Sequence, residues 1–224
     1  MKRSHWMHLS ILTILIAGFS LNATGQAAND APLLPVNVLT QSPAETQTEL
    51  QIICLFQSSP ENTLHGSLVE TNDKLHGLLD QIRKPGLFSG DLGETILLTS
   101  QQGTLNATKL LIIGLGDSET FTPERMTLIG RIALREANRL GIAHPFFAPT
   151  ILDGGVGRFS TGEVAEKVVR GVREAVATES VLRNQNAAPA LRVLDFTYLA
   201  GAKNAANTQI GIDRALDRLH SPAR

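Results

Sequence analysis

Two glycine-rich stretches are the residues of this sequence best suited to chemistry, because glycine amides ahead of a helix can cradle a phosphate or another anion. The first is "GLGDSETF", residues 114–121, and the second is "DGGVGRFSTGE", residues 153–163. Each lies between an apolar run and a helical pattern, where α/β proteins place their phosphate loops. Either stretch could instead be a plain turn from strand to helix.

The first stretch does not match a nucleotide-binding motif. Gly114 and Gly116 supply two glycines of a dinucleotide fingerprint, but Glu119 occupies the place of the third. Asp117 and Glu119 would also repel a phosphate. No Lys-Ser or Lys-Thr pair follows a glycine loop, which excludes a triphosphate loop. We interpret this stretch as a strand-to-helix turn that needs the backbone freedom of glycine.

The second stretch is the better candidate for a binding site. Its glycine amides and the N-terminus of the following helix could together hold a small anion, and an arginine adds positive charge. Asp153 and Glu163 oppose this, and a mobile surface loop is the alternative interpretation. The predicted ligand-binding residues are Gly154, Gly155, Gly157, Arg158 and Ser160.

The sequence predicts no catalytic residue, no metal ligand and no cofactor. The histidines downstream of the N-terminal segment are scattered, and no two have the spacing that places two metal ligands on one helical face. The single cysteine, Cys54, lies within the apolar run "LQIICLF", which favours a buried hydrophobic residue over a nucleophile. No Gly-x-Ser-x-Gly elbow is present.

The N-terminus has the pattern of a secretory signal peptide. Lys2 and Arg3 precede the apolar run "LSILTILIAGFSL", and small residues follow it. The run is shorter than the roughly 20 apolar residues that a spanning helix needs. We therefore predict that residues 1–25 are a signal peptide, that the protein is exported to the periplasm or secreted, and that it has no membrane contact after cleavage.

The charge balance limits the classes of partner. The chain has 20 Lys and Arg against 21 Asp and Glu, without a basic run, so a nucleic-acid partner is not expected. An unknown protein partner and a small anionic ligand both stay open. The sequence leaves the oligomeric state undetermined.

Hydrophobic periodicity predicts the elements that must position the glycine loops. Residues 26–49 are interpreted as a leader with one possible strand at residues 34–39, and residues 50–224 as one α/β domain. Apolar runs predict strands at residues 50–56, 94–99, 109–114, 145–151 and 191–199.

Helices are expected between these strands. One is expected within residues 71–86, with Asn72 as a cap, and one at residues 122–141 with Thr122 as its cap. The second of these helices is expected to bury an apolar stripe of Met126, Ile129, Ala133, Ala137 and Leu140. A third opens with the capping pair Ser160 and Glu163, and the last covers residues 207–219. This alternation predicts a mainly parallel or mixed sheet between two helix layers.

Residues 86–142 resemble the N-terminal domain of leucyl aminopeptidases. That family has a Phe-x-Gly-x-x-Gly-Glu-Thr-x-x-Leu stretch, then a strand ending in Gly-Leu-Gly, then a helix that closes with Leu-Gly. The matching residues here are Phe88, Gly90, Gly93, Glu94, Thr95, Leu98, Gly114, Leu115, Gly116, Leu140 and Gly141. The resemblance implies a single macro-domain-like, three-layer α/β/α domain in which the Gly-Leu-Gly turn is architectural.

The resemblance also bears on function. In leucyl aminopeptidases the metal ions and the catalytic lysine and arginine belong to a C-terminal domain with an Asn-Thr-Asp-Ala-Glu-Gly-Arg motif, which this sequence lacks. We therefore expect an exported, non-catalytic binding or interaction module.

A second similarity supports an alternative function. Residues 149–176 are similar to the second phosphate loop of macro domains, which makes a binder, or less favoured a hydrolase, of ADP-ribose or a related phosphorylated nucleoside the alternative. The stretch "NAAN", residues 204–207, also resembles a macro-domain loop, but that loop comes before the glycine loop in macro domains. Because of this reversed order, we interpret the similarity as coincidence.

Overall fold

The computed structural model describes residues 33–59, 63–83, 87–101 and 103–217. The predicted signal peptide lies outside this part of the chain. The strands are β1 (Val36–Leu39), β2 (Leu50–Leu55), β3 (Thr95–Thr99), β4 (Lys109–Gly114), β5 (Phe146–Ala148) and β6 (Phe196–Leu199). The helices are α1 (Gly66–Lys74), α2 (Leu78–Ile82), α3 (Arg125–Arg139), α4 (Thr161–Asn184) and α5 (Ala205–Asp217).

The described strands form one mixed sheet in the order β1-β6-β5-β2-β4-β3. All neighbours are parallel except β3, which pairs antiparallel with β4. The strand expected at residues 34–39 is β1, and it lies at an edge of the same sheet. The predicted α/β class with a mixed sheet is therefore confirmed.

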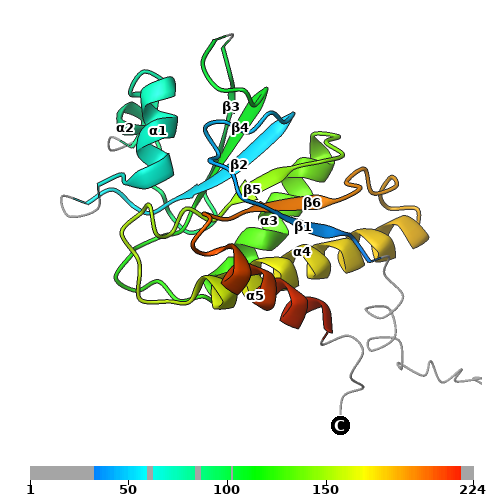
Figure 1. Ribbon diagram of the computed structural model, residues 1–224. Coiled ribbons are helices and arrows are strands. Elements are labelled where there is room, and N and C mark those ends of the chain that lie inside the picture. Colours follow the sequence, from blue (N-terminus) through cyan, green and yellow to red (C-terminus); the bar gives the residue numbers. More distant parts are fainter. Residues whose placement is uncertain (1–32, 60–62, 84–86, 102, 218–224) are drawn as a thin grey trace, which may run out of the picture.

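Helices cover both faces of this sheet (Figure 1). Along β2, Leu50, Ile52 and Cys54 pack toward α3, α4 and α5, whereas Ile53 and Leu55 pack toward α1 and α2. A strand covered on both faces is mostly apolar, since neither set of alternate side chains meets water. This explains why "LQIICLF" shows no apolar–polar alternation. The three-layer arrangement matches the prediction.

The helix α3 buries the predicted apolar stripe. Met126, Ile129, Ala133 and Ala137 are fully buried. The helix begins at Arg125, with Glu124 at the N-cap position and no side-chain cap, so the expected cap at Thr122 is wrong by two residues. None of the helices in the described ranges is both long and apolar enough to cross a membrane.

The helix expected within residues 71–86 is two helices, which corrects that prediction. The chain turns sharply at His76 and Gly77, both with positive φ, and this turn separates α1 from α2. Asn72 does act as a cap, but from within α1 and for the other helix. Its side-chain oxygen accepts hydrogen bonds from the amides of Leu79 (3.0 Å) and Asp80 (3.3 Å) at the start of α2.

Candidate functional site

The first glycine loop packs its backbone against the segment before β3. The amide of Gly116 donates to the carbonyl of Gly90 (2.8 Å), and the amide of Gly93 donates to the carbonyl of Gly114 (2.9 Å). A Cβ on Gly114 would lie 2.1 Å from the carbonyl oxygen of Asp91, so any side chain there would clash with backbone. The interpretation of this loop as an architectural turn agrees with these contacts.

Glu94 has a structural task in the same region. Its carboxylate accepts hydrogen bonds from the Ser89 hydroxyl (2.7 Å) and from the amides of Gly90 (2.8 Å) and Asp91 (3.2 Å). Gly90 and Gly93, which precede Glu94, have positive φ, and Phe88 is buried. The motif that carries the resemblance to leucyl aminopeptidases thus builds a compact loop hydrogen-bonded to the end of β4.

Two backbone amides of the second glycine loop already form hydrogen bonds within the loop. The amides of Gly154 and Gly155 donate to the carbonyls of Thr150 (2.9 Å) and Leu152 (3.0 Å). An anion could bind these amides only by replacing those bonds. Gly157 is exposed, with open space around its Cα. Gly154, in contrast, is buried against the ring of Phe56.

Arg158 and Ser160, the other two predicted ligand-binding residues, also have partners in the fold. Nη2 of Arg158 donates to the carbonyls of Ser118, Glu119 and Phe121, at 2.8 to 3.2 Å. The Ser160 hydroxyl accepts from the amide of Gly162 (3.2 Å), and the Ser160 amide donates to the carboxylate of Glu163 (3.2 Å), which together form a capping box. The capping pair is confirmed. The anion site at this loop stays a prediction.

A cavity lies beside this loop, at the carboxyl ends of β1, β5 and β6. Its volume is about 540 Å³, within the range of small-molecule sites. It is bounded by residues 40–45 after β1, residues 148–153 at the end of β5, residues 198–204 around the end of β6, and the first turns of α4 and α5. In α/β sheets, ligands bind at this edge, beyond the carboxyl ends of the strands.

Two buried hydroxyl groups line the cavity. Tyr198 on β6 is 2% exposed and Thr208 on α5 is 1% exposed. In the described part of the chain, neither hydroxyl oxygen is both fully buried and without a hydrogen-bond partner. Neither therefore carries the desolvation cost of an orphaned polar group. A polar ligand in the cavity could form hydrogen bonds with them.

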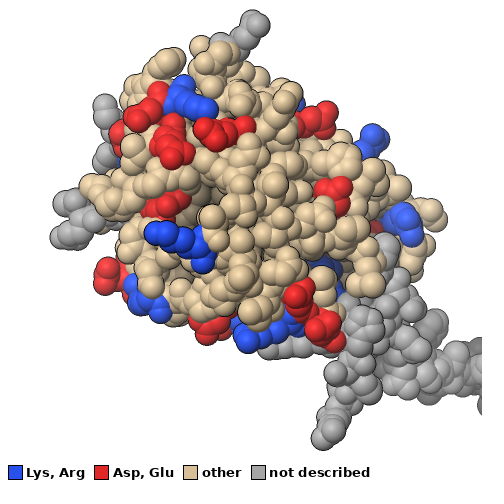
Figure 2. All heavy atoms as spheres, in the orientation of Figure 1, with Lys and Arg blue, Asp and Glu red and all other residues tan. Residues whose placement is uncertain are grey.

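Acidic side chains lie at the mouth of the cavity. Glu70 on α1 accepts a hydrogen bond from the Ser42 hydroxyl (2.6 Å), and Asp153 accepts one from the Ser67 hydroxyl. Burial raises the pKa of Asp153, and the hydrogen bonds from Ser67 oppose that rise. Figure 2 shows acidic side chains, interspersed with basic ones, over the part of this face where α1 and α2 lie.

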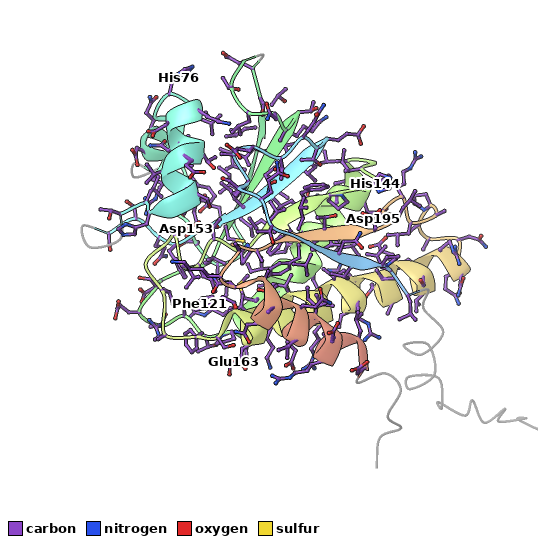
Figure 3. All side chains as sticks on the ribbon, viewed as in Figure 1. His76, Phe121, His144, Asp153, Glu163 and Asp195 are labelled. Atoms are coloured by element: carbon purple, nitrogen blue, oxygen red, sulfur yellow. The ribbon has the colours of Figure 1, made fainter. Side chains whose placement is uncertain are left out.

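A His–Asp pair occupies a different edge of the sheet. Nδ1 of His144 lies 2.5 Å from Oδ2 of Asp195, just before β5 and β6 begin (Figure 3). It is therefore remote from the cavity, which lies where those strands end. In the described ranges, no three His, Cys, Asp or Glu side chains gather as a metal site would require.

The cavity was not predicted from the sequence. Its signal was the rule that ligands collect beyond the carboxyl ends of parallel strands, applied to "APTILD" after β5 and "AGAKN" after β6. The ligand site was instead predicted at the glycines of residues 154–157. Tyr198, the only tyrosine of the chain, read as a strand residue.

Comparison with known proteins identifies similar chains. Residues 52–183 match the family model of the cytosol aminopeptidase family, N-terminal domain. A probable cytosol aminopeptidase of Thermosynechococcus vestitus is 35% identical over 102 residues, which are 43% of this chain and 20% of that protein. The chain therefore spans about a fifth of the length of this curated relative.

Solved structures agree on the fold. A mutant of tomato leucine aminopeptidase aligns with a TM-score of 0.65 and 18% identity over 85% of this chain and 37% of its own. A macrodomain of Oceanobacillus iheyensis aligns at 0.57 with 14% identity, over 81% and 92% of the two chains. A Trypanosoma brucei macrodomain in complex with ADP-ribose aligns at 0.54 with 14% identity, over 81% and 68%. The predicted macro-domain-like fold is confirmed.

Proposed function

This chain belongs to the cytosol aminopeptidase family, whose N-terminal-domain model covers residues 52–183, and from that premise we propose that it is an exported, non-catalytic ligand-binding module. The ligand occupies the cavity at the carboxyl ends of β1, β5 and β6. The observation that carries the proposal is the cavity itself, about 540 Å³ in volume, whose lining combines apolar side chains with the hydroxyl-bearing residues Tyr198 and Thr208.

The proposal that the module is non-catalytic is supported by the structural role of the family motif. Glu94 and the glycines around it are engaged in backbone contacts that shape a loop. Assays for hydrolysis of leucyl amides with added Mn²⁺ or Zn²⁺ test this part. Turnover that co-purifies with the protein through a second column would overturn it.

Export is supported by the charged start, apolar run and small residues of the N-terminal segment. The intact mass of protein recovered from the periplasm or the medium should correspond to a chain that begins near Gln26 or Ala28. A mass that includes Met1, or recovery only from the cytoplasm, would overturn the proposed export.

Binding in the cavity can be tested with two matched tryptophan substitutions. Gly201 lines the cavity mouth, is exposed and has ordinary φ, and the nearest atom to a built Cβ is Asn204 Nδ2 at 3.9 Å. Gly201→Trp should therefore fold normally and fill the mouth. Gly157→Trp places the same side chain in open space on the glycine loop, outside the cavity lining.

Calorimetric titration with a small-molecule panel then separates the two sites. We expect ligands that bind the wild type to be lost in Gly201→Trp and kept in Gly157→Trp. The reverse pattern would place the site at residues 154–157 and refute the cavity. A panel with no ligand whose binding either substitution abolishes would refute the binding module itself.

ADP-ribose is the alternative ligand, since a Trypanosoma brucei macrodomain of similar fold is described in complex with it. The first turns of α4 and α5 border the cavity and would favour its phosphates. The carboxylates at the mouth oppose it. ADP-ribose and ADP therefore belong in the panel. Binding of either that is lost in Gly201→Trp would favour the alternative.

A further inference from the structure

The cavity has an uneven charge. Its lining includes three carboxylates, of Glu45, Glu70 and Asp153, and no lysine, arginine or histidine. Charges of one sign around a low-dielectric hollow reinforce one another and concentrate ions of the opposite sign. The lining therefore attracts cations and repels anions.

Two of these carboxylates come from different elements and meet at the mouth. Glu70 projects from α1, and Asp153 from the loop between β5 and α4. Burial raises the pKa of Asp153, and repulsion from Glu70 adds to that rise, whereas hydrogen bonds with Ser67 and the nearby His65 lower it. A positive charge between them would relieve the repulsion and form charge-assisted hydrogen bonds.

The helix N-termini at the cavity do not reverse this balance. Each helix contributes roughly half a positive charge at its first turn. Two helices, α4 and α5, border the cavity, so their contribution is smaller than that of three formal negative charges. The first turn of α4 is moreover capped by Ser160, whose hydroxyl accepts from the Gly162 amide. Lys203 lies in the loop before α5, but it is exposed and outside the lining.

The interior beyond the mouth combines apolar walls with hydrogen-bonding groups. Side chains of Ile151, Val164 and Leu199 supply apolar surface, next to the hydroxyls of Tyr198 and Thr208. A ligand with a short apolar body and one polar group could contact both kinds of surface. Its charged end would then reach the acidic mouth.

We propose that the cavity binds a small organic amine, with its ammonium group between Glu70 and Asp153 and its body against the walls beside Tyr198. This inference rests on the proposed binding function and names the chemical class of the ligand. The ammonium donates hydrogen bonds to the two carboxylates. The buried hydroxyls bond a hydroxyl or amide group at the ligand's other end.

A matched ligand panel tests the charge preference. Each carbon skeleton is offered as a primary amine, as the corresponding alcohol and as the corresponding carboxylate, alongside ADP-ribose. Binding is followed by calorimetry and by the emission of Tyr198, the only tyrosine, in protein whose predicted signal segment, with the only tryptophan, has been removed. We expect amines to bind, the alcohols to bind more weakly and the carboxylates not to bind.

Matched charge-neutralising variants locate the ammonium group. Glu70→Gln should weaken amine binding about tenfold, the loss expected for one partly exposed charge-assisted hydrogen bond. Glu49→Gln removes the same charge from an exposed residue outside the lining and should leave the affinity unchanged. Lys203→Gln should not weaken amine binding, whereas it would weaken the binding of an anion.

The outcomes separate this inference from the proposed function. Equal or tighter binding of alcohols, carboxylates or ADP-ribose, lost in Gly201→Trp, would overturn the amine preference and leave the binding module standing. If Glu70→Gln weakens amine binding no more than Glu49→Gln does, the assigned position of the ammonium is wrong. If no panel member of any charge binds in a way that Gly201→Trp abolishes, both proposals fail.

Discussion

Arg158 provides the sharpest test of whether the second glycine loop is built for folding or for binding. Its Nη2 donates to the carbonyls of Ser118, Glu119 and Phe121, which belong to the loop that follows β4. Its guanidinium carbon also lies 5.0 Å from the centroid of the Phe159 ring. Replacing Arg158 with alanine removes the side chain that ties the two glycine loops together.

The expected loss of stability follows from these contacts. One Nη2 carries two N–H groups, so three carbonyls share two donors. Because Arg158 is exposed, each donor contributes about 1 kcal/mol rather than the larger value of a buried charged hydrogen bond. The contact with Phe159 adds about 0.5 kcal/mol at an exposed position. Arg158→Ala should therefore lower the free energy of unfolding by about 2.5 kcal/mol, and Arg158→Lys by about half of that.

Urea unfolding measured by circular dichroism gives this quantity, provided that the denaturant slope is unchanged. Arg135→Ala is the matched control, because Arg135 is exposed on α3 and should cost less than about 0.5 kcal/mol. If Arg158→Ala is no more destabilising than Arg135→Ala, the carbonyl contacts do not stabilise the fold. If it also abolishes ADP-ribose binding, Arg158 is a ligand-binding residue, as the sequence predicts.

Two further substitutions test the packing and electrostatics around the site. Gly130→Ala should lower the free energy of unfolding by about 2 kcal/mol in the same urea assay, because a Cβ there would lie 2.1 Å from the Val168 carbonyl oxygen. This overpacking outweighs the gain of about 1 kcal/mol in helix propensity from glycine to alanine. A stabilised variant would contradict the prediction. Burial raises the folded-state pKa of Asp153, so its charged form costs stability above that pKa. Asp153→Asn should accordingly melt no lower than the wild type at neutral pH. Its gain in melting temperature should decline as the pH falls through the folded-state pKa of Asp153 and vanish below the unfolded-state pKa of about 3.9. A gain that grows on acidification would contradict the direction of the pKa shift.

Features that depend on near neighbours in the chain could be predicted from the sequence. The stripe from Met126 to Ala137 and the capping box of Ser160 and Glu163 arise within a few turns of one helix, and both are present as expected. The apolar run at residues 50–56 likewise predicted a strand, which is β2. The family motif at residues 88–95 added the macro-domain-like fold, which periodicity alone could not specify.

Features that depend on contacts between distant segments were decided only by the tertiary structure. Arg158 read as a free cation beside a glycine loop, yet its partners lie at least 37 residues earlier. Asn72 read as the cap of its own helix, but Gly77 lets the chain turn so that it caps the next one. The cavity brings Glu70, Asp153 and Tyr198 together from three separate elements. Local sequence patterns do not predict such long-range contacts, because the order of strands in the sheet decides which loops become neighbours.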